Sequence, residues 1–161
     1  MKKVIVIGCP GSGKSTFARA LGQKTGISVC HLDMLFWNAD KTTVEKEVFL
    51  ERLGAVMEGE EWILDGNFSS TMDMRMAACD TVIFLDYQTD ICLDGVRARR
   101  GKVRVDIPWI ETEEDAEFTE FIKSFAQKRR PQILELIEKY RDKEIHIFKS
   151  REEADIFILN L

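Results

Sequence analysis

The sequence predicts an α/β fold of the doubly wound type, with a parallel sheet covered by helices on both faces. Short, β-branched and nearly continuous apolar runs suit strands that are buried on both sides. These runs alternate with stretches of helical period, as βαβ units with right-handed crossovers require. No internal repeat, low-complexity tract or linker rich in Pro, Gly or Ser interrupts the 161 residues. We therefore expect a single domain over residues 1–161.

Each element follows from its local pattern. The expected strands are 4–7, 27–32, 62–64, 81–85 and 145–148. The expected helices are 15–24, 44–58, 90–100, 113–127, 132–141 and 151–159. Ser150 and Glu153 have the spacing of a capping box at the start of the last helix. The stretch 101–114 joins two helices, carries Lys102, Arg104 and a run of acids, and has little strand character. We expect it to form a mobile cover, or lid, over a site.

Composition restricts the class of protein. An apolar content of 45% and a charged content of 32% are those of a globular chain. No apolar run approaches the roughly 20 residues that a membrane helix needs. The first apolar run is too short for a secretory signal and is cut by a glycine loop, so we expect a cytoplasmic location. The net charge of −5 argues against a general nucleic-acid-binding surface. The four cysteines show no C-x-x-C spacing, which disfavours a zinc site.

The strongest functional signal is the segment Gly8–Ser15, which reads GCPGSGKS. It matches the pattern G-x-x-x-x-G-K-[ST] in full, with a buried strand before it and a helix after it. Its glycines allow positive φ and a close approach to a ligand. The loop N–H groups then converge on an anion, and the following helix adds the positive end of its dipole. The segment predicts a site for the phosphates of a nucleoside triphosphate, ATP with Mg²⁺.

The residues of this loop have distinct expected roles. Lys14 places a positive charge between the β- and γ-phosphates, and the Ser15 hydroxyl supplies one oxygen to magnesium. Thr16 is expected to contact the α-phosphate. The other expected nucleotide-binding positions of the loop are Gly8, Pro10, Gly11, Ser12 and Gly13.

Three carboxylates stand where predicted strands end, at Asp33, Asp65 and Asp86. Open α/β sheets bind their ligands beyond the carboxyl ends of the strands. One carboxylate in such a place is often a helix cap or a turn former. Three of them beside a phosphate loop favour a functional site.

Two further segments carry a resemblance to a known family. Residues 31–37 read His-Leu-Asp-Met-Leu-Phe-Trp, and residues 62–67 read Trp-Ile-Leu-Asp-Gly-Asn. With the phosphate loop, they resemble the adenylate kinase branch of P-loop kinases, and more closely the small bacterial DNA topology modulation proteins. The resemblance implies a three-layer P-loop NTPase fold with a five-stranded parallel sheet in the order 2-3-1-4-5. It also implies that Asp65 holds magnesium through water.

The resemblance assigns lid arginines to a basic stretch. Five cations fall within eight residues, at Arg97, Arg99, Arg100, Lys102 and Arg104. Phosphoryl transfer depends on positioning and on stabilising charge, and we expect Arg97 and Arg104 to contact the phosphates. The alternative is a solvated helix end whose cations complement the helix dipole. Arg129 and Arg130 form a second pair that is equally open to either role. In similar kinases the loop before the last helix borders the adenine, so Ser150 is expected to contact the nucleotide.

The acceptor side departs from true adenylate kinases. They grip AMP with arginines after the second strand and after the Asp-Gly, and this chain has neither. Asp33 is instead expected to orient or deprotonate an acceptor hydroxyl. Phe36, Trp37 and Asn67 are the other expected acceptor contacts, although the two aromatic residues are alternatively core residues. An acceptor with a hydroxyl and a flat or sugar-like body is at least as consistent as AMP.

The favoured function is a small kinase that transfers the γ-phosphate of Mg-ATP to a small acceptor, with Lys14, Asp33, Arg97 and Arg104 as catalytic residues. The alternative is a nucleotide-dependent regulator that binds DNA or a protein, supported only by the basic stretch. A GTPase switch ranks lowest because no Asn-Lys-x-Asp segment follows a later strand. The acceptor, the base preference and the oligomeric state stay open.

Overall fold

The computed structural model describes residues 1–161 and contains one five-stranded parallel sheet. Its strands are β1 (Lys3–Gly8), β2 (Val29–His31), β3 (Trp62–Asp65), β4 (Thr81–Leu85) and β5 (Glu144–Phe148). Their order across the sheet is β2-β3-β1-β4-β5, which confirms the expected order. The strand that leads into the phosphate loop is therefore central.

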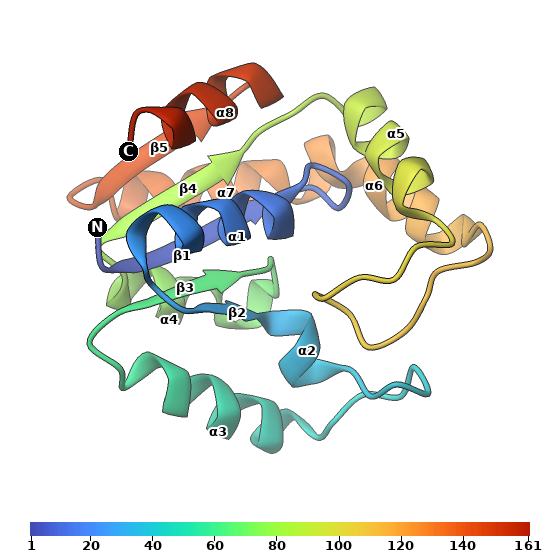
Figure 1. Ribbon diagram of the computed structural model, residues 1–161, viewed down its shortest axis with the longest axis horizontal. Helices are drawn as coiled ribbons and strands as arrows, with labels where there is room; N and C mark the ends of the chain where they lie inside the picture. The colour runs from blue at the N-terminus through green and yellow to red at the C-terminus, as the bar shows by residue number, and fades with distance from the viewer.

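Helices cover both faces of the sheet. They are α1 (Lys14–Thr25), α2 (Leu32–Phe36), α3 (Lys46–Met57), α4 (Ser69–Ala78), α5 (Thr89–Arg99), α6 (Ala116–Lys128), α7 (Arg130–Lys139) and α8 (Arg151–Leu159). In Figure 1, α1 and α8 lie in front of the sheet, and α4, α6 and α7 lie behind it. The helices α2 and α3 extend beyond β2, and the predicted lid lies at the carboxyl ends of the strands. The expected three-layer architecture is confirmed.

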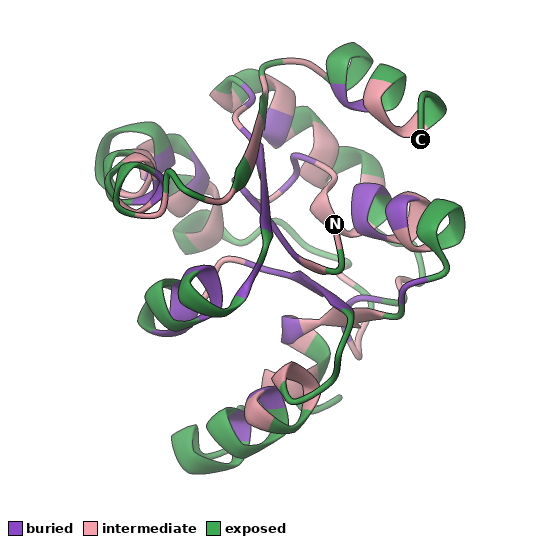
Figure 2. Ribbon diagram, turned by 90° about the vertical axis from the view of Figure 1, so that its left-hand side faces the viewer, coloured by how far each residue is buried: buried purple, intermediate pink, exposed green.

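The burial pattern explains the nearly continuous apolar runs. Residues 4–7 of β1, 62–65 of β3 and 81–85 of β4 are all buried. Figure 2 shows these central strands in purple between helices whose outer faces are green. The edge strand β5 is less covered, and its Ile147 is exposed. Continuous apolarity therefore marks the strands that are sandwiched between two helical layers.

The register of the sheet determines which residues surround the phosphate loop. Asp65, the last residue of β3, is level with His31 on one side and with Val6 on the other. β1 continues two residues further, to Gly8, which is level with Leu85 of β4. The segment that follows Asp65 therefore passes directly beside the start of the phosphate loop.

Two helices were not predicted. The short helix α2 follows β2 without a connecting loop, so no turn residue marks the boundary between strand and helix in the sequence. The helix α4 was missed because its inner face is not purely apolar. Its buried positions are Thr71, Met72, Arg75 and Met76, so a polar and a charged side chain interrupt the helical apolar pattern.

The last helix begins as its sequence predicts. Ser150 is the N-cap of α8, and its hydroxyl accepts a hydrogen bond from the Glu153 N–H at 3.2 Å. The Glu153 carboxylate accepts from the Lys149 N–H at 2.6 Å, one residue before the N-cap. No helix of the chain combines the length and the apolarity needed to cross a membrane.

Candidate nucleotide site

The phosphate loop connects β1 to α1 in the conformation that its glycines predict. Gly11 and Gly13 have φ angles of 86° and 92°, in the left-handed region that glycine adopts readily. Gly13 is the N-cap of α1, and no side chain caps this helix. The first N–H groups of α1 therefore face the loop as donors for an anion, together with the positive end of the helix dipole.

Asn67 fixes the start of the loop. Its carboxamide oxygen accepts from the Gly8 N–H at 3.1 Å, and its amide nitrogen donates to the Gly8 C=O at 2.7 Å. Asn67 was expected to contact the acceptor. In the structure, this side chain binds the backbone of the phosphate loop.

A buried arginine holds the segment that carries Asn67. Arg75 of α4 is fully buried and donates to the carbonyl oxygens of Gly66, Asn67 and Phe68. It also donates to the Thr71 hydroxyl at 3.1 Å. Burial lowers the pKa of Arg75 to about 10. Phe68 has a φ of 39°, which non-glycine residues rarely adopt, and Arg75 stabilises this turn by binding the carbonyls around it.

Helix α5 packs directly onto the backbone of the loop. A Cβ atom on Gly11 would lie 1.9 Å from the carbonyl oxygen of Cys92, and one on Gly95 would lie 2.0 Å from that of Gly11. Only glycine fits at both positions. The Cys9 thiol faces the same helix, and its hydrogen bond with Cys92, together with burial, raises its pKa. Cys9 is therefore a buried thiol and not a reactive thiolate.

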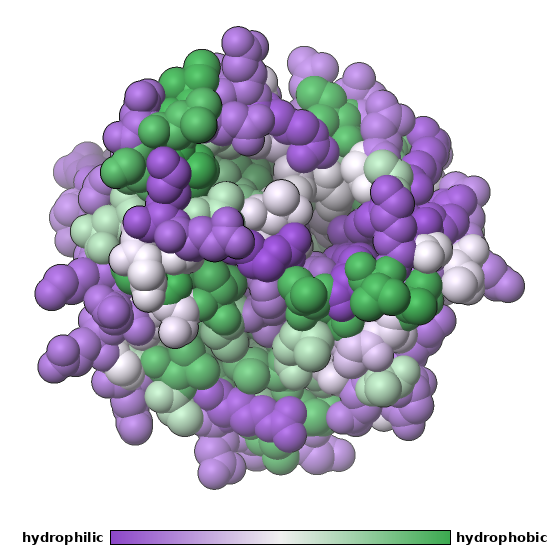
Figure 3. All heavy atoms as spheres, in the orientation of Figure 1, coloured by the Kyte–Doolittle hydropathy of each residue, from purple (hydrophilic) through white to green (hydrophobic).

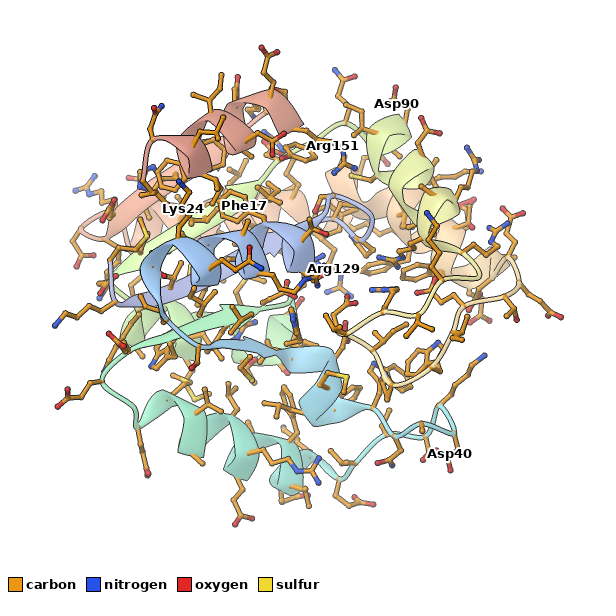
Figure 4. The ribbon with its side chains drawn as sticks, in the orientation of Figure 1. Phe17, Lys24, Asp40, Asp90, Arg129 and Arg151 are labelled. Atoms are coloured by element: carbon orange, nitrogen blue, oxygen red, sulfur yellow. The ribbon has the colours of Figure 1, made fainter.

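Arg151, the first residue of α8, supports the outer side of the loop. Its guanidinium donates to the carbonyl oxygens of Gly11 and Ser12, each at 3.0 Å, and stacks on the Tyr87 ring at 5.6 Å. Figure 4 shows Arg151 between α8 and the loop. The carbonyl oxygens of Gly11 and Ser12 thus bind a cation on the side of the loop that faces α8.

Asp65 stands beside the loop in the expected place for a magnesium-binding carboxylate. It is buried, and its Oδ2 lies 2.6 Å from His31 Nδ1. Its Oδ1 is buried without any protein partner, as is the hydroxyl of Ser12. Buried oxygens are normally hydrogen-bonded, so these two atoms fit a site that is completed by a ligand. Through its contact with Oδ2, His31 orients the Asp65 carboxylate.

Asp33 lies in the first turn of α2 and is influenced by several charges of the site. Burial raises its pKa to about 6, opposed by Lys14 and reinforced by Asp65 and Asp106. A carboxylate with a pKa near 6 is suited to accept a proton at neutral pH. The charges of Lys14 and Asp65 thus lie close enough to Asp33 to shift its pKa.

Ion pairs stabilise the predicted lid internally and connect it to α5. Arg104 forms a two-pronged pair with Asp106 and a further pair with Glu111. Glu111 also pairs with Arg99 at 3.3 Å. Burial opposes the charge of Asp106, but the hydrogen bonds and the positive charge of Arg104 outweigh it, and the pKa of Asp106 is lowered. Asp106 of the lid lines the same cleft as Ser15, the residue that was expected to bind magnesium.

The phosphate loop, α5 and the lid enclose a cleft of about 740 Å³. Its cationic wall consists of Arg19, Arg99, Lys102, Arg104 and Arg151. Figure 3 shows the face hollowed near its centre, with an apolar patch over the lid, where Val103 and Val105 are exposed. Gly11, Gly13, Ser15 and Thr16 line the cleft, whereas Pro10 and Ser150 do not.

Arg97 is placed differently from the other predicted lid arginine. It lies on the exposed side of α5 and pairs with Asp94 at 3.3 Å. It does not line the cleft, whereas Arg99, two residues later, does. Two residues along a helix point in different directions, so only one of these side chains faces the site.

The aromatic residues after β2 pack against one another. The Phe36 ring contacts those of Phe49 and Phe68 at centroid distances of 5.4 and 5.0 Å. Trp37 lies edge-on to Trp109 of the lid at 5.3 Å. Phe36 thus has a packing role, and Trp37 docks the lid onto the arm formed by α2 and α3.

Asp86, the third strand-end carboxylate, is used structurally. Arg130 binds it with two hydrogen bonds of 2.8 and 2.9 Å, and Lys149 binds it as well. These contacts connect the end of β4 to the starts of α7 and α8. Arg130 is therefore fully engaged, whereas its neighbour Arg129 contacts Ser69 at 3.3 Å and has no carboxylate partner.

Sequence reasoning missed Arg75, Gly95 and Arg151. An isolated glycine in a helical pattern often marks a close backbone approach, and Gly95 carried that signal. Arg75 and Arg151 carried none, because a lone arginine on a helix is usually solvated. Their roles depend on carbonyl groups that only the folded chain brings near them.

Comparison with solved structures identifies the fold. Shikimate kinase from Acinetobacter baumannii in complex with shikimate superposes with a TM-score of 0.64 and 16% identity, covering 99% of this chain and 90% of that one. Shikimate kinase from Bacteroides thetaiotaomicron gives 0.60 and 22%, covering 98% and 94%. Deoxyadenosine kinase from M. mycoides with bound dATP gives 0.58 and 15%, covering 98% and 97%.

The chain has the fold of P-loop kinases. These similarities span nearly the whole length of each protein, at identities that establish the fold alone. No family model and no curated protein sequence matches the chain. The resemblance to DNA topology modulation proteins therefore stays a prediction.

Proposed function

We propose that this chain is a small ATP-dependent kinase that transfers the γ-phosphate of Mg-ATP to a hydroxyl group of a small acceptor. The observation that carries the proposal is the convergence of Lys14, Asp33, Asp65 and Arg104 on one side of the phosphate loop. Lys14, Asp65 and Arg104 each shift the pKa of Asp33, which supports a site where their charges lie near its carboxyl group. The shared fold of shikimate kinase and deoxyadenosine kinase supports the same reaction class.

The residues present fit a magnesium ion. Ser15 and Asp65 would hold it, directly and through water, and Asp65 has one buried oxygen free for this purpose. Magnesium usually keeps several waters and takes few protein ligands, so a hydroxyl and one carboxylate beside a triphosphate suffice. When bound, the ion would neutralise charge on the β- and γ-phosphates.

Side chains of the protein bind the phosphates, stabilise the charge of the transferred group and accept the proton of the acceptor. Lys14 and the loop N–H groups bind the phosphates, and Arg104 and Arg99 stabilise charge on the transferred group. The acceptor oxygen forms a bond to the γ-phosphorus, the bond from that phosphorus to the β–γ bridging oxygen breaks, and ADP leaves. Asp33 accepts the proton of the acceptor hydroxyl. Closure of the lid through Trp37 and Trp109 excludes water, which would otherwise take the phosphoryl group.

The test is acceptor-dependent ADP release by the purified chain with Mg-ATP. The panel contains shikimate and deoxyadenosine, for which the structural neighbours are named, together with nucleoside monophosphates and small sugars. We expect one class to raise ADP release at least tenfold over the ATPase background, and Asp33→Asn to abolish this stimulation. ATP binding without stimulation by any acceptor would contradict the proposal and favour a nucleotide-dependent regulator.

A further inference from the structure

A second pocket lies behind the sheet, between α4, α6 and α7. Its volume is about 250 Å³, and it begins at Asn67, whose carboxamide binds Gly8 of the phosphate loop. Its walls are largely apolar and come from Met72, Phe121, Phe125, Ile133 and Leu136. Ligand cavities usually measure roughly 300–1,000 Å³, so this pocket fits a single ring or a short branched molecule and not a nucleotide.

The mouth of this pocket carries an arginine with no anionic partner. Arg129 contacts the Ser69 hydroxyl at 3.3 Å and the face of the Phe121 ring at 5.6 Å. No carboxylate lies within ion-pair distance of it, whereas the adjacent Arg130 is held by Asp86. A guanidinium has five N–H donors, and here most of them stay available for a planar anionic group. Figure 4 shows Arg129 near the carboxyl ends of the strands.

The surroundings of Arg129 also favour negative charge. Helix α4 begins at Ser69, and no side chain caps it, so the positive end of its dipole faces the pocket mouth. Gln132 and Asn67 add amide groups to the lining. The pocket thus combines an apolar interior with a cationic entrance beside the phosphate loop.

We propose that this pocket binds the acceptor of the reaction, and that the acceptor is a compact molecule with an anionic group, a carboxylate or a phosphate monoester, bound by Arg129. The role of this pocket as an acceptor site rests on the proposed kinase function, whereas the chemical class of its ligand rests on the pocket alone. Arg129 also takes the place of the arginine that true adenylate kinases carry after the Asp-Gly and that this chain lacks after Asp65 and Gly66. That cation comes from the junction of α6 and α7, far along the chain.

Binding of simple probes tests the assignment without any turnover. Benzoate, phenyl phosphate and the uncharged benzyl alcohol are titrated into ¹⁵N-labelled Lys14→Met protein, in which anion binding by the phosphate loop is weakened. The side-chain amide of Gln132 and the Arg129 Nε–H group report on the pocket. We expect saturable shifts with at least one of the two anions, and at least tenfold weaker binding of benzyl alcohol. The stronger of the two anions identifies the acceptor's charged group as carboxylate or phosphate.

Two variants provide the controls. Arg129→Met, in the same background, should weaken binding of the anions at least tenfold, and Arg129→Lys should retain part of it. Arg141→Met should leave binding unchanged, because Arg141 is exposed and pairs only with Glu138. Equal binding of benzyl alcohol, no effect of Arg129→Met, or shifts confined to the phosphate loop would each overturn the assignment. ATP-dependent transfer is measured separately, so the kinase proposal and the pocket can fail independently.

Discussion

The carboxamide of Asn67 binds the Gly8 peptide on both sides, accepting from its N–H and donating to its C=O. This contact ties the end of β3, where Asp65 lies, to the first residue of the phosphate loop. The Asp65 carboxylate and the start of the phosphate loop are therefore held in one fixed arrangement. Arg75 stabilises this arrangement by binding the carbonyl groups of three successive residues, Gly66, Asn67 and Phe68.

Replacing Asn67 by Asp tests this arrangement. The substitution keeps the size of the side chain but places a negatively charged oxygen against the Gly8 carbonyl. We expect Mg-ATP to bind at least tenfold more weakly, while the free energy of unfolding falls by about 1–2 kcal/mol. Calorimetric titration and urea denaturation measure the two effects. Asn160→Asp, at the exposed end of α8, is the matched control, and an equal effect there would rule out a specific role for Asn67.

The contact between α5 and the phosphate loop leads to a second prediction. Gly95→Ala raises intrinsic helix propensity by about 1 kcal/mol, yet its Cβ would meet the Gly11 carbonyl oxygen at 2.0 Å. We expect the loop to shift and Mg-ATP binding to weaken at least tenfold. Gly54→Ala, where no atom lies within 4 Å of the new Cβ, should stabilise the protein by roughly 0.5–1 kcal/mol and leave binding intact. Unaltered nucleotide binding by Gly95→Ala would contradict the close packing.

Asp33 predicts a pH dependence of catalysis. Because a base must be ionised to accept a proton, kcat/KM should rise as the pH increases through about 6, the folded-state pKa of Asp33. Asp33→Asn should lower kcat roughly 100-fold or more and remove this rise. Initial rates between pH 5 and 8 with the identified acceptor measure both effects. A rise that persists in Asp33→Asn would assign the base to another residue.

The same residue makes a prediction about stability. The pKa of Asp33 is raised on folding from 3.8 to about 6, so the folded state holds this proton more tightly than the unfolded state does. The contribution of Asp33 to stability is therefore greatest below pH 3.8 and is lost as the pH rises to 6. Asp33→Asn should be more stable than the wild type above pH 6, by roughly 2–3 kcal/mol. The difference should vanish near pH 3.5, as denaturation at the two pH values would show.

The two arginines expected in the lid should differ in effect. Arg104 lines the cleft and pairs there with Asp106, whereas Arg97 does not line it and pairs with Asp94 on α5. An arginine that stabilises the transferred phosphoryl group contributes about 10³-fold or more to kcat. We expect Arg104→Met to lower kcat at least tenfold further than Arg97→Met does. Equal losses would mean that Arg97 turns inward when the nucleotide binds.

The phosphate loop and the sheet order could be predicted because their signals are local or are implied by a resemblance. The glycine pattern of residues 8–15 encodes backbone conformation directly, and the apolar runs encode burial. The placement of Asp65 beside the loop followed from the expected strand order and is confirmed by the register. These properties depend on a few neighbouring residues or on one topological rule.

The remaining features depend on contacts between distant segments. Arg151, near the end of the sequence, binds carbonyl groups of the phosphate loop near its beginning. Arg129, at the junction of α6 and α7, contacts Ser69 of α4. The direction of Arg97 and Arg99 depends on how α5 is rotated against the loop, which a basic stretch of five cations in eight residues does not encode. The acceptor side is assembled almost entirely from such contacts, so the sequence described the donor side better.

Titration of Mg-ATP into the purified chain by calorimetry tests the central claim most directly, with Lys14→Met as the comparison. We predict one saturable site in the wild type and at least tenfold weaker binding in the variant, a difference of about 1.4 kcal/mol or more. The absence of saturable binding to the wild type, or equal binding by Lys14→Met, would contradict a nucleotide site at the phosphate loop.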